Sequence, residues 1–301
     1  MPLATTLGDR DTRIVRCGDE EATMTTATLS TNGSPKAVSI LGVDVVPFES
    51  YAEAVKCAEE TIASRRKTFW VAINPEKIQT ALGDTQLRSV LAEADVGLCD
   101  GIGVAIAARL LQGVKLRRCT GCDLFFHLMA RAAEKGWKVF LLGASPESSG
   151  RACARLVERF PGLQIVGHRD GYFNDSSEVV AEVNASQADM LFVAMGSPRQ
   201  EYWISEHREA LHPPFCMGVG GSLDIASGEA PRAPRFFQKT GMEYFYQVIF
   251  RPGWSAGVRW RRTLSRLSFM MAVLRETMAG RGNRCRTVAS ASHAGSGGKH
   301  A

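Results

Sequence analysis

Short β-branched and apolar runs alternate with helical patterns between residues 38 and 219, and this alternation limits the fold more than any other feature. A short run bounded by turn residues predicts a strand, whereas apolar residues every three or four positions predict a helix. Strands that are joined through helices pair in parallel, and the helices cover both faces of the sheet. We therefore predict an α/β fold with a mostly parallel, Rossmann-like sheet and helices on both faces.

The individual elements follow from the same patterns. We predict strands at 38–46, 68–73, 96–98, 138–142, 164–166, 190–194 and 215–219. We predict helices at 51–64, 101–111, 123–135, 146–159 and 177–184. Ligands bind such sheets at the carboxyl ends of the strands, so the Gly-rich and polar turns after the strands are where chemistry is expected.

The two ends of the chain differ from this core. Residues 1–36 are rich in Thr, Ser, Gly and acidic residues, and they are predicted to form a flexible tail. Residues 281–301 have a similar composition and the same prediction. Between the tails, we expect a core at 37–235 and a helical C-terminal appendage at 236–280.

The appendage carries the positive charge of the chain. Residues 251–286 contain nine Arg, no Lys and one acid, Glu276, so the segment has a charge of +8 in a chain of +5. One helical face is predicted from Met242, Phe245, Tyr246 and Ile249. A second apolar stripe consists of Trp260, Leu264, Leu267, Met271 and Leu274, with arginines beside it. Such a helix either packs on the core or meets anionic lipid or phosphate at a membrane surface.

The expected location is the cytoplasm, peripheral on the inner face of the cell membrane. No apolar run approaches the roughly 20 residues that a membrane-spanning helix needs. Residues 1–12 lack the basic start and apolar core of a secretory signal.

The cysteines favour buried thiols over a disulfide framework in such a chain. Cys119 and Cys122 form a C-x-x-C, which leaves a redox role open, but no second pair or suitably spaced histidine accompanies them. No Asp-x-Asp lies within the core, since Asp9-Arg10-Asp11 belongs to the N-terminal tail. We therefore expect neither a metal nor a cofactor.

The turn Asp100-Gly101-Ile102-Gly103 follows a predicted strand and opens a helix. Glycines there allow a ligand to approach the backbone, and a helix N-terminus favours an anion. Asp100 is placed either to act as a base or to cap the helix. The third glycine of the dinucleotide fingerprint is missing.

Four further turns have similar features, at residues 118–124, 141–147, 193–201 and 218–224. Thr120 or Asp123 could cap a helix instead of binding a ligand. In the third of these turns, Gly196 ends a strand and Gln200 and Glu201 follow it as polar groups at the rim. Glycines at the end of the last strand suggest the close approach of a flat or charged ligand, with simple turn formation as the alternative.

Taken in order, these turns resemble the WecG/TagA/CpsF family of glycosyltransferases over about residues 39–275. The matching residues are Asn74-Pro75, Asp100-Gly101-Ile102-Gly103, Arg118, Thr120-Gly121, Asp123-Leu124, Gly171-Tyr172-Phe173, Gly196-Ser197-Pro198-Arg199-Gln200-Glu201, Gly218-Val219-Gly220-Gly221, Asp224, Arg232-Ala233-Pro234 and Gly241-Met242-Glu243. The chain departs from the family pattern at Ala72, where a Thr is usual, and at Tyr244, where a Trp is usual. The C-terminal arginines also follow Pro252-Gly253 later than expected.

The resemblance implies an inverting, metal-independent transfer of a sugar from a UDP donor to an undecaprenyl-diphosphate-linked acceptor, in cell-surface polysaccharide synthesis. The sugar would be N-acetylmannosamine, its uronate or glucose. Asp100 is the predicted general base. The predicted substrate-binding residues are Asn74, Gly101, Gly103, Arg118, Thr120, Asp123, Gly143, Gly196, Gln200, Glu201, Gly220, Asp224, Arg232, Arg251, Arg259 and Arg262.

Two other classes of protein remain as alternatives. An NAD-dependent oxidoreductase would use a similar sheet, although no turn offers the full Gly-x-Gly-x-x-Gly. A non-catalytic nucleotide-sugar-binding module would bind a UDP-sugar without turnover. A nucleic-acid partner is not expected, because the basic cluster is helical and lacks interleaved aromatic residues on a sheet. The apolar stripe would also suit a homo-oligomer.

Overall fold

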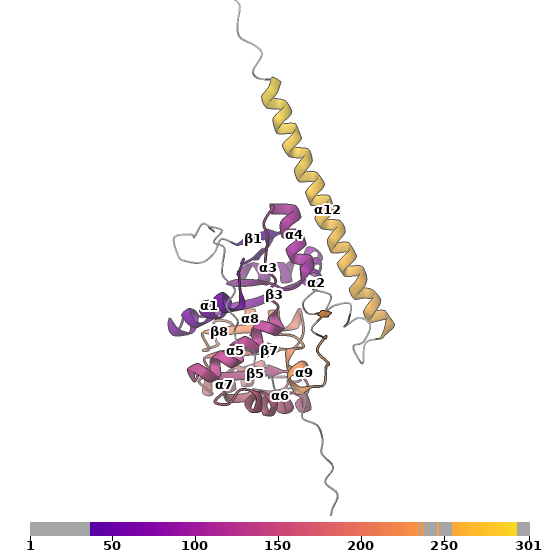
Figure 1. Cartoon of the computed structure of the whole chain (residues 1–301). Helices are drawn as coiled ribbons and strands as arrows, with labels where there is room; N and C mark the ends of the chain where they lie inside the picture. The colour runs from indigo at the N-terminus through magenta and orange to yellow at the C-terminus, as the bar shows by residue number, and fades with distance from the viewer. Residues whose placement is uncertain (1–36, 235, 238–245, 247–254, 294–301) are drawn as a thin grey trace, which may run out of the picture.

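A parallel sheet of six strands forms the centre of the structure, a computed structural model that describes residues 37–234, 236–237, 246 and 255–293 (Figure 1). The strands are β3 (Thr68–Ile73), β4 (Val96–Cys99), β5 (Lys138–Gly143), β6 (Gln164–Arg169), β7 (Met190–Ala194) and β8 (Phe215–Gly218). Their spatial order is β4-β3-β8-β7-β5-β6, and every neighbouring pair is parallel. The predicted α/β, Rossmann-like fold class is confirmed.

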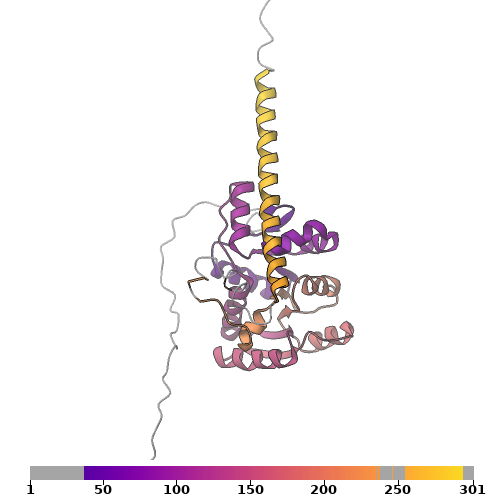
Figure 2. The same ribbon diagram turned by 90° about the vertical axis from the view of Figure 1, so that its right-hand side faces the viewer.

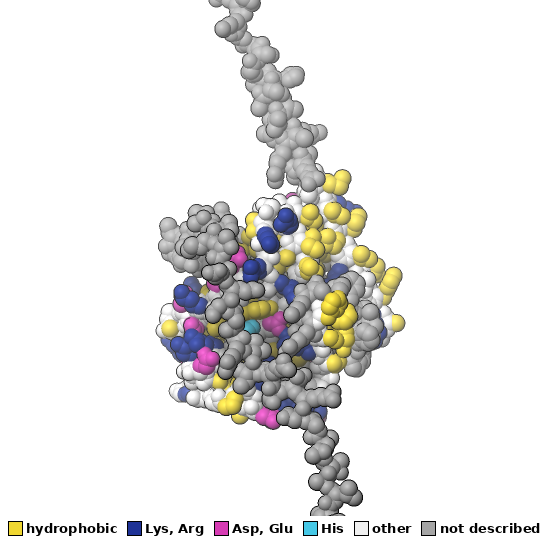
Figure 3. All heavy atoms as spheres, in the orientation of Figure 1, with side chains coloured by type: hydrophobic (Ala, Val, Ile, Leu, Met, Phe, Trp, Pro, Cys, Tyr) yellow, Lys and Arg dark blue, Asp and Glu magenta, His cyan; other side chains and the backbone are white. Residues whose placement is uncertain are grey.

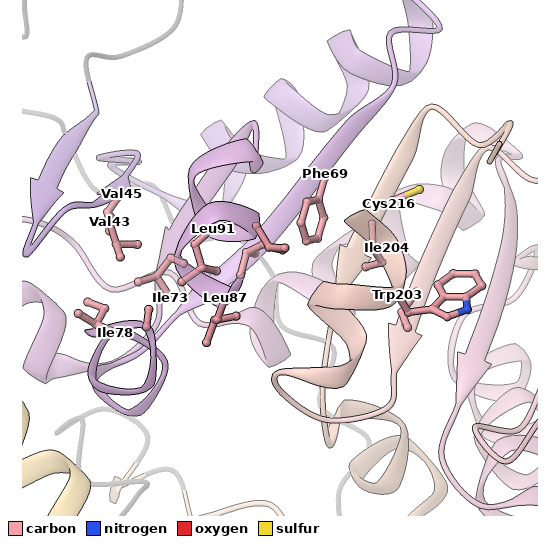
Figure 4. Close-up of a cluster of buried hydrophobic side chains, with 14 of the residues drawn as sticks. Val43, Val45, Phe69, Ile73, Ile78, Leu87, Leu91, Trp203, Ile204 and Cys216 are labelled. Carbon is pink, nitrogen blue, oxygen red and sulfur yellow. The ribbon is translucent and has the colours of Figure 1, made fainter. Parts of the chain in front are cut away.

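The inner strands are buried on both faces, which explains their nearly continuous apolar sequences. Along β3, Phe69, Val71 and Ile73 join one hydrophobic cluster, whereas Trp70 joins the other. Figure 4 shows Phe69 and Ile73 in the first cluster, together with Ile78, Leu87 and Ile204 from the helices that cover this face. The period of two along each strand therefore divides the core into two halves.

Helices cover both faces. The face with Phe69 is covered by α2 (Pro75–Gly83), α3 (Thr85–Glu93), α4 (Ile102–Gln112), α7 (Ser176–Ala185) and α8 (Arg199–His207). The opposite face is covered by α1 (Tyr51–Ala63), α5 (Gly121–Lys135), α6 (Pro146–Arg159) and α9 (Ser222–Ser227). Side-chain caps set several helix starts: Ser50, Asn74, Asp84, Thr120, Ser145 and Asp175 each accept a hydrogen bond from a backbone N–H of the first turn.

The predicted single strand at 38–46 is wrong, because the segment is a hairpin. It consists of β1 (Val38–Ile40) and β2 (Val43–Val45), which pair antiparallel through Ile40 and Val43. The two turn residues between them, Leu41 and Gly42, have φ angles of 51° and 83°. A two-residue hairpin turn with both φ angles positive matches the twist of its strands.

Helix α12 (Ala256–His293) lies against α2 and α4 and extends past them (Figures 1 and 2). Phe269 and Val273 are its fully buried anchors. A flexible tail was predicted from residue 281, but the helix continues to His293. Residues 278–293 contain no proline that would end it. In the described part of the chain, no helix is long and apolar enough to cross a membrane.

The predicted apolar stripe on α12 does not face the core. Trp260, Leu264, Leu267, Met271 and Leu274 are all exposed, Trp260 to 66%. Figure 3 shows hydrophobic side chains gathered on the side of the molecule along which α12 runs. The predicted N-terminal tail lies outside the described residues, as does the helical face at 242–249 except Tyr246.

Candidate functional site

A cavity of about 730 Å³ opens at the carboxyl ends of the strands. Its walls come from the turns after all six strands of the sheet, from the start of α5 and from Arg262 of α12. Eight of the predicted site residues line it: Asn74, Asp100, Thr120, Gly196, Gln200, Gly220, Asp224 and Arg262. The cavity therefore brings together, at one edge of the sheet, motifs that lie more than 180 positions apart.

Asp100 is half-buried in this cavity, directly after β4. Its backbone N–H donates to the carbonyl of Ile73 at 2.9 Å, which ties it to the end of β3. Gly101, the next residue, is the N-cap of α4 and has no side chain with which to cap it. Asp100 thus lines the cavity from a backbone position that is tied to the end of β3.

Asn74 has two roles, because it lines the cavity and also caps α2. Its Oδ1 accepts from the backbone N–H of Lys77 at 2.8 Å, and Pro75 occupies the first helical turn. The cap fixes the start of α2 at the cavity wall. Lys77 and Glu76, in the first turn of this helix, also line the cavity.

Glu201 was predicted to line the cavity, but it lies beneath the wall and is completely buried. Its Oε1 accepts from Nζ of Lys77 at 2.7 Å and from Nε2 of Gln200 at 2.8 Å. Oε1 of Gln200 accepts from the N–H of Gly220 at 2.9 Å. The buried carboxylate therefore orients Lys77 and Gln200, which do reach the cavity, and links α2, α8 and the turn after β8.

Sequence reasoning missed Lys77, although the pattern contains a signal for it. Ile78 and Ala81 belong to the buried face of α2, and Lys77 lies one helical turn before Ala81 on that face. A lysine there needs a buried partner, because an unpaired buried charge costs several kcal/mol. The partner, Glu201, is 124 positions away and could not be identified from local spacing.

Thr120 and Asp123 form a second polar cluster at the start of α5. Oγ1 of Thr120 accepts from the backbone N–H of Asp123 at 3.2 Å and donates to Oδ2 of that residue at 2.8 Å. The Tyr51 hydroxyl also donates to Oδ2, at 3.1 Å, and burial raises the pKa of Tyr51. Asp123 forms an ion pair with Arg232. Asp123 and Arg232 therefore support the wall at Thr120 and are not among the residues that line the cavity.

Two of the glycines that were predicted to bind substrate lie where a larger side chain would clash with its neighbours. A β-carbon at Gly103 would lie 2.6 Å from Cγ of Pro75, so its absence allows α4 to approach α2. A β-carbon at Gly143 would lie 2.4 Å from the carbonyl oxygen of Ala194, at the end of the neighbouring strand. Neither residue lines the cavity. Both contacts give a steric reason for glycine at these positions, and the predicted contact of these glycines with substrate stays a prediction.

The remaining residues that were predicted to bind substrate are not among the described residues that line the cavity. Gly101 and Arg118 flank the cavity without lining it, and Arg259 lies on α12 without lining it. Arg251 lies outside the described residues. Within the described part of the chain, Gly101, Arg118 and Arg259 are thus not among the residues that line the cavity.

The cysteines are free thiols wherever the structure describes them. Burial raises the pKa of both Cys99 and Cys119 to about 12, and the nearby Asp100 acts in the same direction. Because the thiolate is the reactive form, Cys119 is poorly suited to a redox role at neutral pH. Within the described ranges, no group of three or more His, Cys, Asp or Glu side chains could hold a metal ion.

The sequence matches the family model described as "Glycosyl transferase WecG/TagA/CpsF family" over residues 38–283. This chain belongs to the WecG/TagA/CpsF family of glycosyltransferases. The match covers the whole sheet, the cavity and most of α12. The chain is thus a transferase, which decides against the oxidoreductase alternative.

Two curated relatives extend this assignment of a WecG/TagA/CpsF-family enzyme. One from Bacillus spizizenii (strain ATCC 23059 / NRRL B-14472 / W23) is 37% identical over 222 residues, which are 73% of this chain and 84% of the relative. One from Bacillus subtilis (strain 168) is 34% identical over 204 residues, which are 68% of this chain and 78% of the relative. Both relatives are named N-acetylglucosaminyldiphosphoundecaprenol N-acetyl-beta-D-mannosaminyltransferase.

Proposed function

We propose that this enzyme transfers a sugar from a UDP donor to an undecaprenyl-diphosphate-linked acceptor, with inversion and without a metal ion. N-acetylmannosamine is the first candidate for the sugar, because the names of both relatives specify it; its uronate and glucose are the alternatives. The observation that carries the proposal is the cavity of about 730 Å³, which has Asp100 and Gln200 in its walls. Its volume suits a nucleotide-sugar.

Asp100 is the proposed general base. It would remove the proton of the acceptor hydroxyl as the oxygen attacks the anomeric carbon of the donor, and UDP would leave from the opposite side. The half-buried position of Asp100 in the cavity wall, at the end of β4, supports this role. A single displacement of this kind inverts the anomeric centre.

The leaving diphosphate needs positive partners as its charge develops. Arg262 is the first candidate, since it lines the cavity and its Nε lies 3.5 Å from Oε1 of Glu76 at the start of α2. Lys77 also lines this wall, but its charge is balanced by the buried carboxylate of Glu201. Gly220 offers an open backbone, because nothing lies within 4 Å of where its β-carbon would be. Arg251 and Arg259 remain proposed partners from the sequence pattern.

The exposed face of α12 is the proposed contact with the inner membrane surface. Leu264, Leu267 and Met271 are exposed on it, and Arg259, Arg261, Arg262, Arg266 and Arg275 flank it. Apolar side chains that enter the interface, combined with arginines that attract anionic lipid, are typical of peripheral membrane helices. Arg262 belongs to this helix and also to the cavity wall, so docking would bring the site to a lipid-linked acceptor.

A transfer assay tests the proposed function. The purified full chain is given UDP-N-acetylmannosamine (formed by an epimerase), its uronate or UDP-glucose, together with a short-chain lipid-diphosphate N-acetylglucosamine. We expect UDP release with one of these donors only when the acceptor is present, and a product in which the anomeric centre is inverted. Donor binding without release for every pair would instead favour a non-catalytic module.

A further inference from the structure

A second, smaller cavity of about 320 Å³ lies between α5, α6 and α9. We call it the arginine pocket, because Arg155, Arg159 and Arg232 line it. Its other lining residues are Phe126, Leu156, Ile225 and Ala226. No acidic side chain is among the described residues that line it. The pocket therefore combines three guanidinium groups with an apolar wall.

Two of these guanidinium groups lie over the ring of Phe126. Cζ of Arg159 lies 4.6 Å from the centre of the ring, and Cζ of Arg232 lies 5.6 Å from it. Both distances are within the range of a cation–π contact. Asp123 forms an ion pair with Arg232, and its single carboxylate balances only one of the three charges. Arg155 and Arg159 are exposed, so solvent weakens the repulsion between these charges, and a bound anion would reduce it further.

Two further features point to an anion. Nε of Arg232 is buried and has no hydrogen-bond partner among the described residues, whereas buried polar groups normally have one. Arg155 packs against Gly228, where a β-carbon would clash with its guanidinium group. Gly228 thus leaves room for Arg155 at the pocket. Arginines bind phosphate oxygens through two parallel N–H groups, so the donor set suits a phosphate or diphosphate.

We propose that the arginine pocket binds the diphosphate of the lipid-linked acceptor, and this inference rests on the proposed function. Its volume is less than half that of the donor cavity, which suits a diphosphate better than a nucleotide-sugar. Leu156, Ile225 and Ala226 provide an apolar wall for the first unit of a prenyl chain.

The arginine pocket also connects directly to the donor cavity. Ile225 lines both cavities. Arg232 contacts Asp123, which accepts a hydrogen bond from Thr120 in the donor wall. A diphosphate held by Arg232 would therefore sit one ion pair and one hydrogen bond away from that wall. The two cavities are therefore neighbours, as a donor site and an acceptor site would be.

The test uses the full chain with saturating UDP, so that the donor cavity is filled, and farnesyl diphosphate as the probe. We expect binding by calorimetry, weakened at least about tenfold in Arg155→Gln/Arg159→Gln, because each charge-assisted hydrogen bond contributes substantially. The control is Arg66→Gln/Arg109→Gln, which removes the same charge from two exposed arginines elsewhere and should bind as the wild type does. Arg232 is left intact because its ion pair supports α5.

Kinetics and vesicles separate the remaining outcomes. In the transfer assay, the double variant should raise the KM for the acceptor at least about tenfold and leave the KM for the donor unchanged. An unchanged acceptor KM would overturn this proposal while the proposed function stands. If the wild type transfers nothing, but the double variant loses farnesyl diphosphate binding, the proposed function fails and the anion site is supported. The double variant could instead lose binding to phosphatidylglycerol vesicles and still bind farnesyl diphosphate as the wild type does. That result would overturn the proposed acceptor site in favour of a site for a lipid headgroup.

Discussion

Nζ of Lys77 lies 2.7 Å from Oε1 of Glu201, and the two side chains are only 3% and 0% exposed. The pair joins the first turn of α2 to the first turn of α8, across the floor of the donor cavity. The same carboxylate oxygen accepts from Gln200, which in turn accepts from Gly220. One buried ion pair thus holds three parts of the proposed donor site in register.

Removing the cation should destabilise the fold. Lys77→Met leaves the carboxylate of Glu201 buried without its cation, and such a change costs about 3–5 kcal/mol in the free energy of unfolding. Lys77→Met/Glu201→Gln should recover much of this loss, because the neutral amide still accepts from Gln200. Urea unfolding of the three proteins measures both effects. Equal stability of the single variant and the wild type would show that the pair does not hold the site.

UDP should protect Cys122 from alkylation. Cys122 lines the donor cavity and is half-buried, so a maleimide can reach it only while the cavity is empty. Cys153 of α6 is also half-buried but does not line the cavity, so it is the control for effects away from the cavity; burial raises its pKa to about 11, so it needs a longer labelling time. Peptide mass spectrometry after timed labelling should show slower modification of Cys122 alone when UDP is present. Protection of neither cysteine, under conditions in which UDP binds, would place the nucleotide elsewhere.

Stability should fall as the pH rises above about 9. Burial raises the pKa of Cys99 and Cys119 to about 12 from the usual 9.0, so the folded state favours the protonated thiols. The resulting stabilisation is complete below pH 9 and is lost progressively between pH 9 and 12, because the unfolded chain ionises first. Thermal unfolding at pH 8, 9 and 10 checks this. Cys99→Ala/Cys119→Ala should show a shallower decline over the same interval.

The exposed face of α12 should bind anionic vesicles. Leu264→Ser/Leu267→Ser/Met271→Ser removes apolar surface that is already exposed, so the fold should be retained while flotation with phosphatidylglycerol vesicles falls at least about tenfold. Val157→Ser/Val166→Ser alters two exposed apolar residues on α6 and β6 and serves as the control. If the triple variant floats as the wild type does but changes its oligomeric state, the face is an interface between copies.

Much of the fold could be predicted because its signals are local. The strand at 68–73 and the helix at 146–159 were predicted with the bounds that the structure shows, the helix because Ser145 and Pro146 mark its start. The hairpin was missed because Leu41 turns with a positive φ angle, which a β-branched and apolar run does not signal.

The site was predictable only in part, for a different reason. Asp100 and Gln200 follow strands β4 and β7, and parallel strands bring such positions to one edge. Whether a side chain then reaches the cavity depends on partners that are remote in sequence. Glu201 is drawn beneath the wall by Lys77, and Asp123 is held by Arg232, 109 positions away. Neither pairing has a signature in local spacing.

The general base is the central claim, and the initial rate of UDP release by Asp100→Asn tests it most directly. The rate is measured with both substrates, in EDTA, next to the wild type and Asp175→Asn, which keeps a cap on the exposed start of α7. We predict a wild-type rate that survives EDTA, a rate about 10²–10⁴-fold lower for Asp100→Asn, and no change for Asp175→Asn. A wild-type rate in Asp100→Asn would contradict the account.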